Sequence, residues 1–164
     1  MILSIDPSST AIGVALFDMT GRNVDCCRLT PNYSGAACLH KLNMLANELK
    51  SYIDDMKFEH REIAIVVIEQ PPTHQGPRSN PGAQHQAFGM VGRVLYECDL
   101  KRIYEVHPAT WTGNRKKENR QWRIRQTLGL AMNQDKGGDA VDALQLGKWW
   151  IGRNKHLLRV ELTA

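Results

Sequence analysis

The sequence contains no apolar run long enough to cross a membrane. Its longest run near mid-chain, residues 63–68, is far short of the about 20 residues that a transmembrane helix needs. The N-terminus carries Asp6 and has no basic residues ahead of an apolar stretch, so it does not resemble a secretory signal. These absences predict a soluble, intracellular protein, cytoplasmic and without a membrane partner.

Cysteine is scarce and lacks the spacing of a metal site. The four cysteines include no CxxC pair, and no histidine stands at zinc-ligand distance from them. Cys26 and Cys27 are adjacent, so on a strand they point to opposite faces. Reduced, structural thiols are therefore predicted, and a zinc or disulfide framework is excluded.

Internal repeats and low-complexity segments are also absent. The chain has 164 residues, of which 42% are hydrophobic, a length and composition typical of one globular domain. We predict a single domain over residues 1–153, followed by a short and loosely ordered C-terminal tail over residues 154–164.

Positive charge is concentrated in one stretch. The net charge is +4, and six cations fall between residues 115 and 125: Arg115, Lys116, Lys117, Arg120, Arg123 and Arg125. Basic clusters are often no more than solvated helix faces. Here Trp111 and Trp122 are interleaved with the cations, which favours a polyanion such as nucleic acid as the partner.

The apolar pattern predicts an α/β fold with a mixed central sheet flanked by helices. Strands are expected at residues 1–5, 13–17, 23–30, 63–68 and 101–106, and helices at about 35–56, 82–99, 118–130 and 139–151. Tight turns join the first three strands, which should be antiparallel. Run 63–68 is apolar throughout, as in a strand of a parallel or mixed sheet that is buried on both faces.

Four acidic residues need a common explanation. Asp6 and Glu69 each end an apolar strand, and Asp139 and Asp142 lie three residues apart on one helix face. Each acid alone is explained more simply, as a strand-end, capping or surface residue. If the strands before Asp6 and Glu69 are neighbours in the sheet, however, the last helix can lay its acidic face across their ends.

Four carboxylates in one place repel one another unless cations neutralise them. All-oxygen ligands select hard divalent ions, Mg²⁺ or Mn²⁺. Two such ions form a known clamp for phosphodiester hydrolysis. Beside a basic stretch, the acids therefore favour a nuclease.

Three segments carry a resemblance to a known family. Ile5-Asp6-Pro7-Ser8-Ser9-Thr10 with Gly13, then Val67-Ile68-Glu69-Gln70, then Asp139-Ala-Val-Asp142-Ala-Leu144 resemble, in order and spacing, the RuvC family of Holliday junction resolvases. That family belongs to the RNase H-like, retroviral-integrase-like superfamily. The resemblance covers about residues 1–151, and the compact length suggests a phage or viral member.

The resemblance implies roles for residues of this chain. Asp6, Glu69, Asp139 and Asp142 would be catalytic acids that bind Mg²⁺ or Mn²⁺, two ions per site, and Lys117 would act at the scissile region. A homodimer would cut branched DNA, with its interface on the helix that carries Ala87, Val91, Val94 and Leu95. The candidate DNA contacts are His74 and Arg78, in the proline-rich loop after Glu69, and Arg115, Lys116, Lys117, Arg120 and Arg123.

Three other functions stay open at this point, and the intact set of acids argues against one of them, a DNA-binding protein that does not cleave. A broader structure-selective nuclease of the same fold could cut forks, flaps or RNA–DNA hybrids. An actin-like ATP-binding domain shares a similar first turn, but such proteins need two domains to enclose the nucleotide, and this chain has room for one.

Overall fold

The structure is a computed structural model, and it describes residues 1–31, 38–60, 62–71, 80–113, 135 and 138–161. The predicted helix at 118–130 and the cations at 115–125 lie outside these ranges, as do His74 and Arg78. In the described part of the chain, no helix is long and apolar enough to span a membrane.

Five strands form one mixed sheet, as the apolar pattern predicts. The strands are β1 (Ile2–Pro7), β2 (Ile12–Phe17), β3 (Asn23–Leu29), β4 (Ile65–Glu69) and β5 (Ile103–Val106), in the spatial order β3-β2-β1-β4-β5. The first three strands pair antiparallel, whereas β4 runs parallel to both β1 and β5. The expected neighbours β1 and β4 therefore lie side by side at the centre of the sheet.

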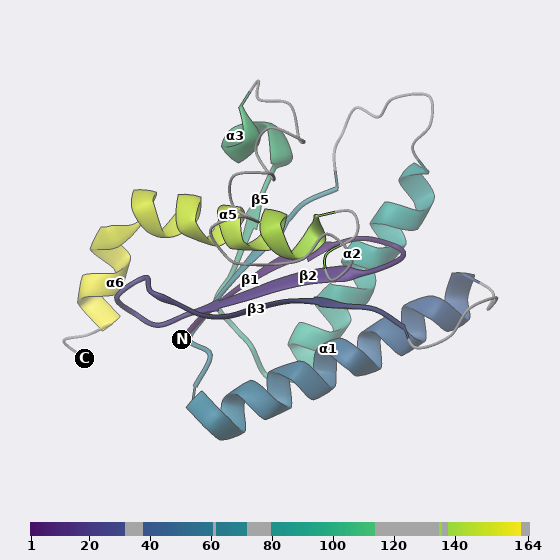
Figure 1. Ribbon diagram of the computed structural model, residues 1–164, viewed down its shortest axis with the longest axis horizontal. Coiled ribbons are helices and arrows are strands. Elements are labelled where there is room, and N and C mark those ends of the chain that lie inside the picture. The colour runs from purple at the N-terminus through teal and green to yellow at the C-terminus, as the bar shows by residue number, and fades with distance from the viewer. Residues whose placement is uncertain (32–37, 61, 72–79, 114–134, 136–137, 162–164) are drawn as a thin grey trace.

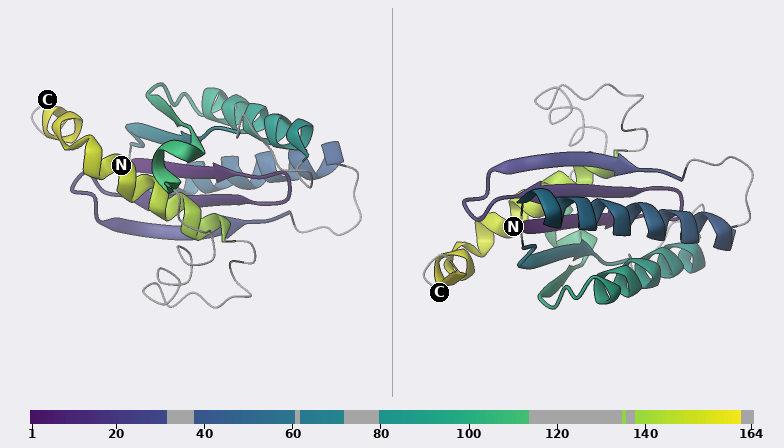
Figure 2. Two further views of the ribbon diagram at one scale, coloured as in Figure 1. Left: turned by 90° about the horizontal axis from the view of Figure 1, so that it is seen from above. Right: turned by 90° about the horizontal axis from the view of Figure 1, so that it is seen from below.

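Helices cover both faces of the sheet. One face packs against α1 (Cys38–His60) and α2 (Pro81–Glu97), which also pack on each other. The other packs against α5 (Asp139–Arg153), which crosses β1, β2 and β3. In Figure 1, α5 lies above the sheet and α1 below it, and the two views of Figure 2 show each layer in front of the strands. This three-layer arrangement confirms the predicted fold class.

Strand alternation decides which residues face α5. Ile2, Ala15 and Phe17 belong to the hydrophobic cluster under that helix, while Leu3 and Ile5 belong to the cluster under α1 and α2. Because successive side chains point to opposite faces, Asp6, four residues after Ile2, lies on the same face as Ile2. Glu69 likewise shares a face with Ile65 and Val67 on β4.

The main differences from the prediction are one helix end and two short helices that the sequence did not indicate. Helix α1 continues to His60, one turn past the expected end at residue 56. A short helix, α3 (Pro108–Thr112), follows β5, with His107 accepting a hydrogen bond from the Ala109 backbone N–H at its start. The stretch after Arg153 contains α6 (Lys155–Glu161), whose Leu158 is buried in the cluster under α5. The expectation of a loosely ordered tail is therefore wrong for residues 155–161.

The structure also corrects the predicted dimer surface. Ala87, Val91, Val94 and Leu95 are buried in the core that α2 forms with the sheet and α1. Their spacing is that of a helix stripe, and in this fold the stripe faces inward. These four side chains therefore cannot be presented to a second copy. The outward side of α2 includes Tyr96, whose exposed fraction is 84%.

Candidate active site

Two of the four acids meet at the carboxyl edge of the central strands. The parallel register pairs Ile5 of β1 with Ile68 of β4, so the next residues, Asp6 and Glu69, are neighbours at the ends of adjacent strands. Both belong to the face of the sheet that α5 covers. Strand pairing and parity thus bring together two carboxylates that are 63 positions apart in the sequence.

The other two acids occupy the first turn of α5. Asp139 and Asp142 are buried, with exposed fractions of 9% and 3%. The helix starts after Gly138, which has a positive φ of 80° and a left-handed conformation. Carboxylates near a helix N-terminus interact favourably with the helix dipole and with its free N–H groups.

Asp135 fixes this end of the helix, although the sequence motif did not include it. Its buried carboxylate accepts hydrogen bonds from the backbone N–H groups of Ala140 (3.0 Å) and Val141 (3.3 Å). Its carbonyl oxygen also accepts from the Gly138 N–H at 3.1 Å. These bonds satisfy helix N–H groups that have no partner inside the helix. Asp135 therefore sets the start of α5 and with it the backbone positions of Asp139 and Asp142.

Gly13 allows α5 to approach the sheet. A Cβ atom placed on Gly13 would lie 1.9 Å from the carbonyl oxygen of Asp139 and 2.2 Å from its carbonyl carbon. Gly13 is paired with Asp6 on one side and with Arg28 of β3 on the other. The backbone of Asp139 therefore lies directly over the position on β2 that separates these two side chains.

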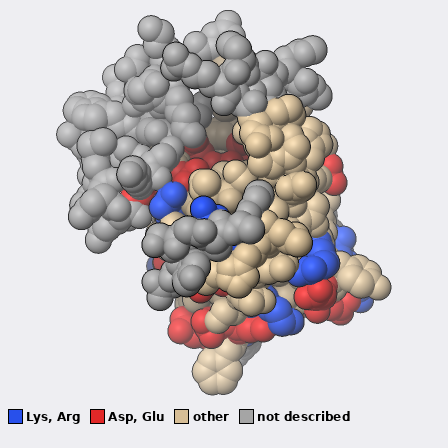
Figure 3. Space-filling view, turned by 90° about the vertical axis from the view of Figure 1, so that its right-hand side faces the viewer, with Lys and Arg blue, Asp and Glu red and all other residues tan. Residues whose placement is uncertain are grey.

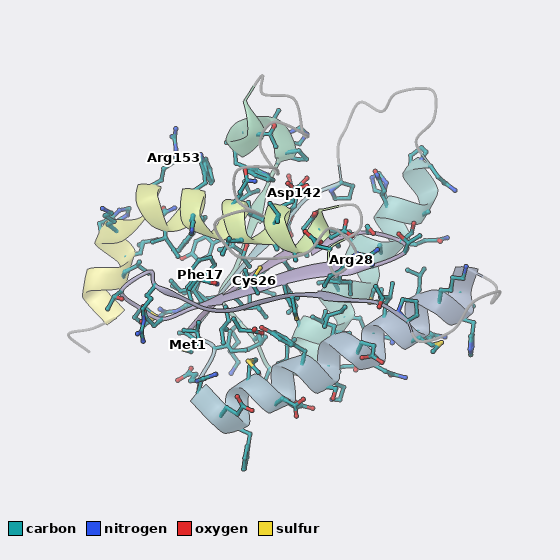
Figure 4. The ribbon with its side chains drawn as sticks, in the orientation of Figure 1. Met1, Phe17, Cys26, Arg28, Asp142 and Arg153 are labelled. Carbon is teal, nitrogen blue, oxygen red and sulfur yellow. The ribbon has the colours of Figure 1, made fainter. Side chains whose placement is uncertain are left out.

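Two of the acids have further partners that the sequence did not reveal. Glu69 accepts a hydrogen bond through Oε2 from the indole Nε1–H of Trp111 in α3, at 3.1 Å. Asp139 accepts one through Oδ2 from the Nε–H of Arg28, at 2.8 Å, and the two form an ion pair that is largely shielded from solvent. Figure 4 shows Arg28 beneath the N-terminal end of α5, near Asp142.

All four acids line one pocket. Its cavity volume is about 300 Å³, and its walls come from the ends of β1 and β4 and from α2, α3 and α5. The lining residues are Asp6, Pro7, Ser8, Glu69, Gln70, Pro71, Gln84, Phe88, Pro108, Thr112, Asp139 and Asp142. Figure 3 views the molecule from this end and shows acidic side chains within a recess of the surface.

The ligand types fit a hard divalent cation. Within the part of the chain that the structure describes, every ionisable side chain that lines the pocket is a carboxylate, and carboxylate oxygens are the ligands that Mg²⁺ and Mn²⁺ prefer. Among the described residues, however, no group of three or more His, Cys, Asp or Glu side chains lies close enough together to hold one ion. The acids are thus gathered in one pocket, where pairs of them could hold an ion together with water or phosphate oxygens.

The neighbouring thiols do not alter this chemistry. Cys26, under α5, donates a hydrogen bond through Sγ to the carbonyl oxygen of Ala140 at 3.3 Å. Burial, reinforced by the charge of nearby acidic groups, raises the pKa of Cys26 to about 12, and burial also raises the pKa of Cys27 to about 12. Both thiols are therefore protonated near neutral pH.

Sequence reasoning located the acids and missed what positions them. Arg28 lies on a predicted strand, but only the register shows it opposite Gly13. Asp135 stands three residues before the N-cap Gly138, outside the position from which a capping side chain normally acts, so no local signal marked it. The predicted DNA contacts Lys117, Arg120 and Arg123 lie outside the described residues, as do Arg115 and Lys116, so their placement relative to the pocket stays a prediction.

Comparison with solved structures identifies the fold. No family model and no curated protein matches the sequence. The structure superposes on Thermus thermophilus RuvC in complex with a Holliday junction substrate with a TM-score of 0.61 at 17% identity, over 93% of this chain and 94% of that one. The Fowlpox virus resolvase bound to Holliday junction DNA gives 0.52 at 14% identity, over 93% and 99%.

A third structure, the yeast mitochondrial Holliday junction resolvase Ydc2, superposes with a TM-score of 0.54 at 11% identity, over 96% of this chain and 82% of that one. The chain thus has an RNase H-like fold. Within that class, its fold is that of RuvC and the other Holliday junction resolvases, as the resemblance in the sequence implied. The viral source suggested by the compact length stays a prediction.

Proposed function

We propose that this protein is a metal-dependent endonuclease that resolves four-way DNA junctions by paired phosphodiester hydrolysis. The observation that carries the proposal is the convergence of Asp6, Glu69, Asp139 and Asp142 on one pocket. These acids come from two central strands and one crossing helix, on a fold shared with proteins solved in complex with Holliday junction DNA. The site would act in the cytoplasm.

In this proposal the four carboxylates hold Mg²⁺ or Mn²⁺, two ions per site. Bound cations of this kind activate water and stabilise charge on the leaving oxygen of a phosphodiester. Trp111 donates to one oxygen of Glu69 and thereby restricts rotation of that carboxylate. Asp135 fixes the start of α5, so Asp139 and Asp142 are held on a rigid element rather than on a loop.

The cations between residues 115 and 125 supply the DNA-binding surface. Arg115, Lys116, Arg120 and Arg123 would pair with backbone phosphates and make affinity fall steeply with salt concentration. Lys117 would instead reach the scissile region, so Lys117→Ala should lower the cleavage rate more than the affinity. His74 and Arg78 are proposed as additional phosphate contacts from the loop after Glu69.

Paired cutting requires two active sites, so we propose a homodimer with two-fold symmetry. A supercoiled plasmid that extrudes a cruciform tests this directly. Two cuts within one binding event convert the plasmid to linear product, whereas a monomeric nuclease first accumulates nicked circles. Nicked circles alone at limiting enzyme, together with elution as a monomer, would contradict the dimeric resolvase and leave the acid site intact.

The function itself is tested with a labelled four-way junction and a linear duplex of matched sequence, each with and without Mg²⁺. We expect cleavage of the junction alone, and only with the ion. Equal cleavage of forks, flaps or RNA–DNA hybrids would favour the broader structure-selective nuclease. No cleavage of any branched substrate in Mg²⁺ or Mn²⁺ would refute both.

A further inference from the structure

Arg28 is an arginine placed against one of the four acids of the pocket. It lies on β3, at the edge of the sheet, and its Nε–H donates to Asp139 Oδ2 at 2.8 Å. The side chains of Arg28 and Asp139 are only 18% and 13% exposed. An ion pair shielded to this degree is screened much less by water and salt than one on an open surface.

The fold brings these two side chains together. Arg28 is the register partner of Gly13 on β2, and the backbone of Asp139 lies directly over Gly13. Since Gly13 has no side chain, nothing on β2 stands between β3 and the first turn of α5. The pairing is therefore built into three elements that are far apart in the sequence, and it does not depend on a mobile surface side chain.

Asp139 lies between the pocket and Arg28 and contacts both. Asp139 lines the pocket together with Asp6, Glu69 and Asp142, whereas Arg28 is not among the lining residues. One oxygen of Asp139 is thus occupied by a cation that approaches from the β3 side. The guanidinium brings a full positive charge to that oxygen.

We propose that Arg28 is a resident counter-cation of the acid pocket, which competes with the divalent ion for the charge of Asp139. This inference rests on the proposed metal-dependent function and adds a residue that sets how readily the site fills. Without the ion, Arg28 offsets the repulsion among the four acids. When an ion binds, it must share or displace the Arg28 pair, which raises the cation concentration needed to occupy the site.

The test is Mn²⁺ binding to the full-length protein, measured by titration calorimetry. Arg28→Gln keeps a hydrogen-bond donor of similar reach and removes the charge. We expect it to bind Mn²⁺ about tenfold more tightly, a change of about 1.4 kcal/mol, because one competing positive charge is lost. Arg28→Lys keeps the charge but loses the planar guanidinium, and its affinity should lie between those of Arg28→Gln and the wild type.

Arg22→Gln is the matched control. Arg22 pairs with Asp18 through the same kind of contact, Nε to Oδ2 at 3.1 Å, but its side chain is 80% exposed and the pair is remote from the pocket. The same change of charge there should leave Mn²⁺ affinity unaltered. In a background of Asp139→Asn, Arg28→Gln should also have little effect, because the carboxylate for which the two cations compete is gone.

A second readout is thermal stability. Without metal, Arg28→Gln should melt below the wild type, and Mn²⁺ should raise its melting temperature by more than it raises that of the wild type. Unchanged or weaker Mn²⁺ binding by Arg28→Gln would overturn the role of Arg28 while the metal site stands. If the wild type itself binds no Mn²⁺, the proposed metal-dependent function fails, and the inference fails with it.

Discussion

Replacing Gly13 with alanine tests whether the close approach of α5 to β2 is needed for the site. A Cβ at this position would lie 1.9 Å from the Asp139 carbonyl oxygen, whereas non-bonded heavy atoms rest at about 3.5 Å, so the start of α5 must move by about 1.5 Å. The obstructing atoms are backbone, and they cannot rotate away. Asp139 and Asp142 move with the helix.

The displacement should cost both stability and activity. Overpacking of this kind destabilises by about 1–3 kcal/mol, which lowers the melting temperature by about 3–10 °C in a chain of this size. In the proposed site, a shift of about 1 Å in these acids should lower the cleavage rate by up to about a hundredfold. Junction cleavage in Mg²⁺ and a thermal melt measure the two effects on the same preparation.

Gly92→Ala is the control for the same substitution. Gly92 lies on the exposed side of α2, where a Cβ meets no atom within 4 Å. Alanine there should leave cleavage unchanged and stabilise the helix by about 0.5–1 kcal/mol. If Gly13→Ala cleaves and melts like the wild type, the close approach of α5 has no bearing on the site and the reasoning is refuted.

Three further predictions follow from other contacts. Asp135→Ala should destabilise the protein by about 1–3 kcal/mol and weaken cleavage, because it removes both hydrogen bonds to the start of α5. Asp135→Asn should recover part of each loss. Equal behaviour of the two variants would count against the capping role. Ser4 has a buried hydroxyl without a hydrogen-bond partner among the described residues. Ser4→Ala should therefore leave the free energy of unfolding unchanged or raise it by about 1 kcal/mol. A clear decrease in urea titration would contradict this. Burial raises the pKa of Cys26 and Cys27 from 9.0 to about 12, so the folded state retains protons that the unfolded chain loses. The free energy of unfolding should therefore fall as pH rises from about 9 towards 12. Rapid alkylation of both folded thiols at pH 8, read by peptide mass spectrometry, would refute this.

The sheet could be predicted because its signals are local. Apolar runs ending at Ile5 and Ile68 mark central strands by composition alone, and tight turns make the first three strands antiparallel. The stripe on α2 shows where such reasoning stops. Ala87, Val91, Val94 and Leu95 have the spacing of a buried helix face, and spacing cannot say whether a face packs inside the chain or against a second copy.

The acids of the site were predictable, but the residues that hold them were not. Asp6, Glu69, Asp139 and Asp142 each stand at the end of a recognisable element. The placement of Arg28 depends on strand register, that of Trp111 on the short helix after β5, and the role of Gly13 on the path of a helix more than 120 positions away. These are tertiary relations, and no local pattern in the sequence encodes them.

The central claim is that the four acids form the hydrolytic site of a junction-resolving nuclease. The most direct measurement compares Asp6→Asn and Glu69→Gln with the wild type on one labelled four-way junction, with binding and cleavage followed in parallel. In the proposed site, removing a carboxylate takes away a metal ligand and leaves the cations of residues 115–125 unchanged, so we expect junction affinity to be retained or increased while Mg²⁺-dependent cleavage is lost. Cleavage at the wild-type rate by both variants would contradict the claim.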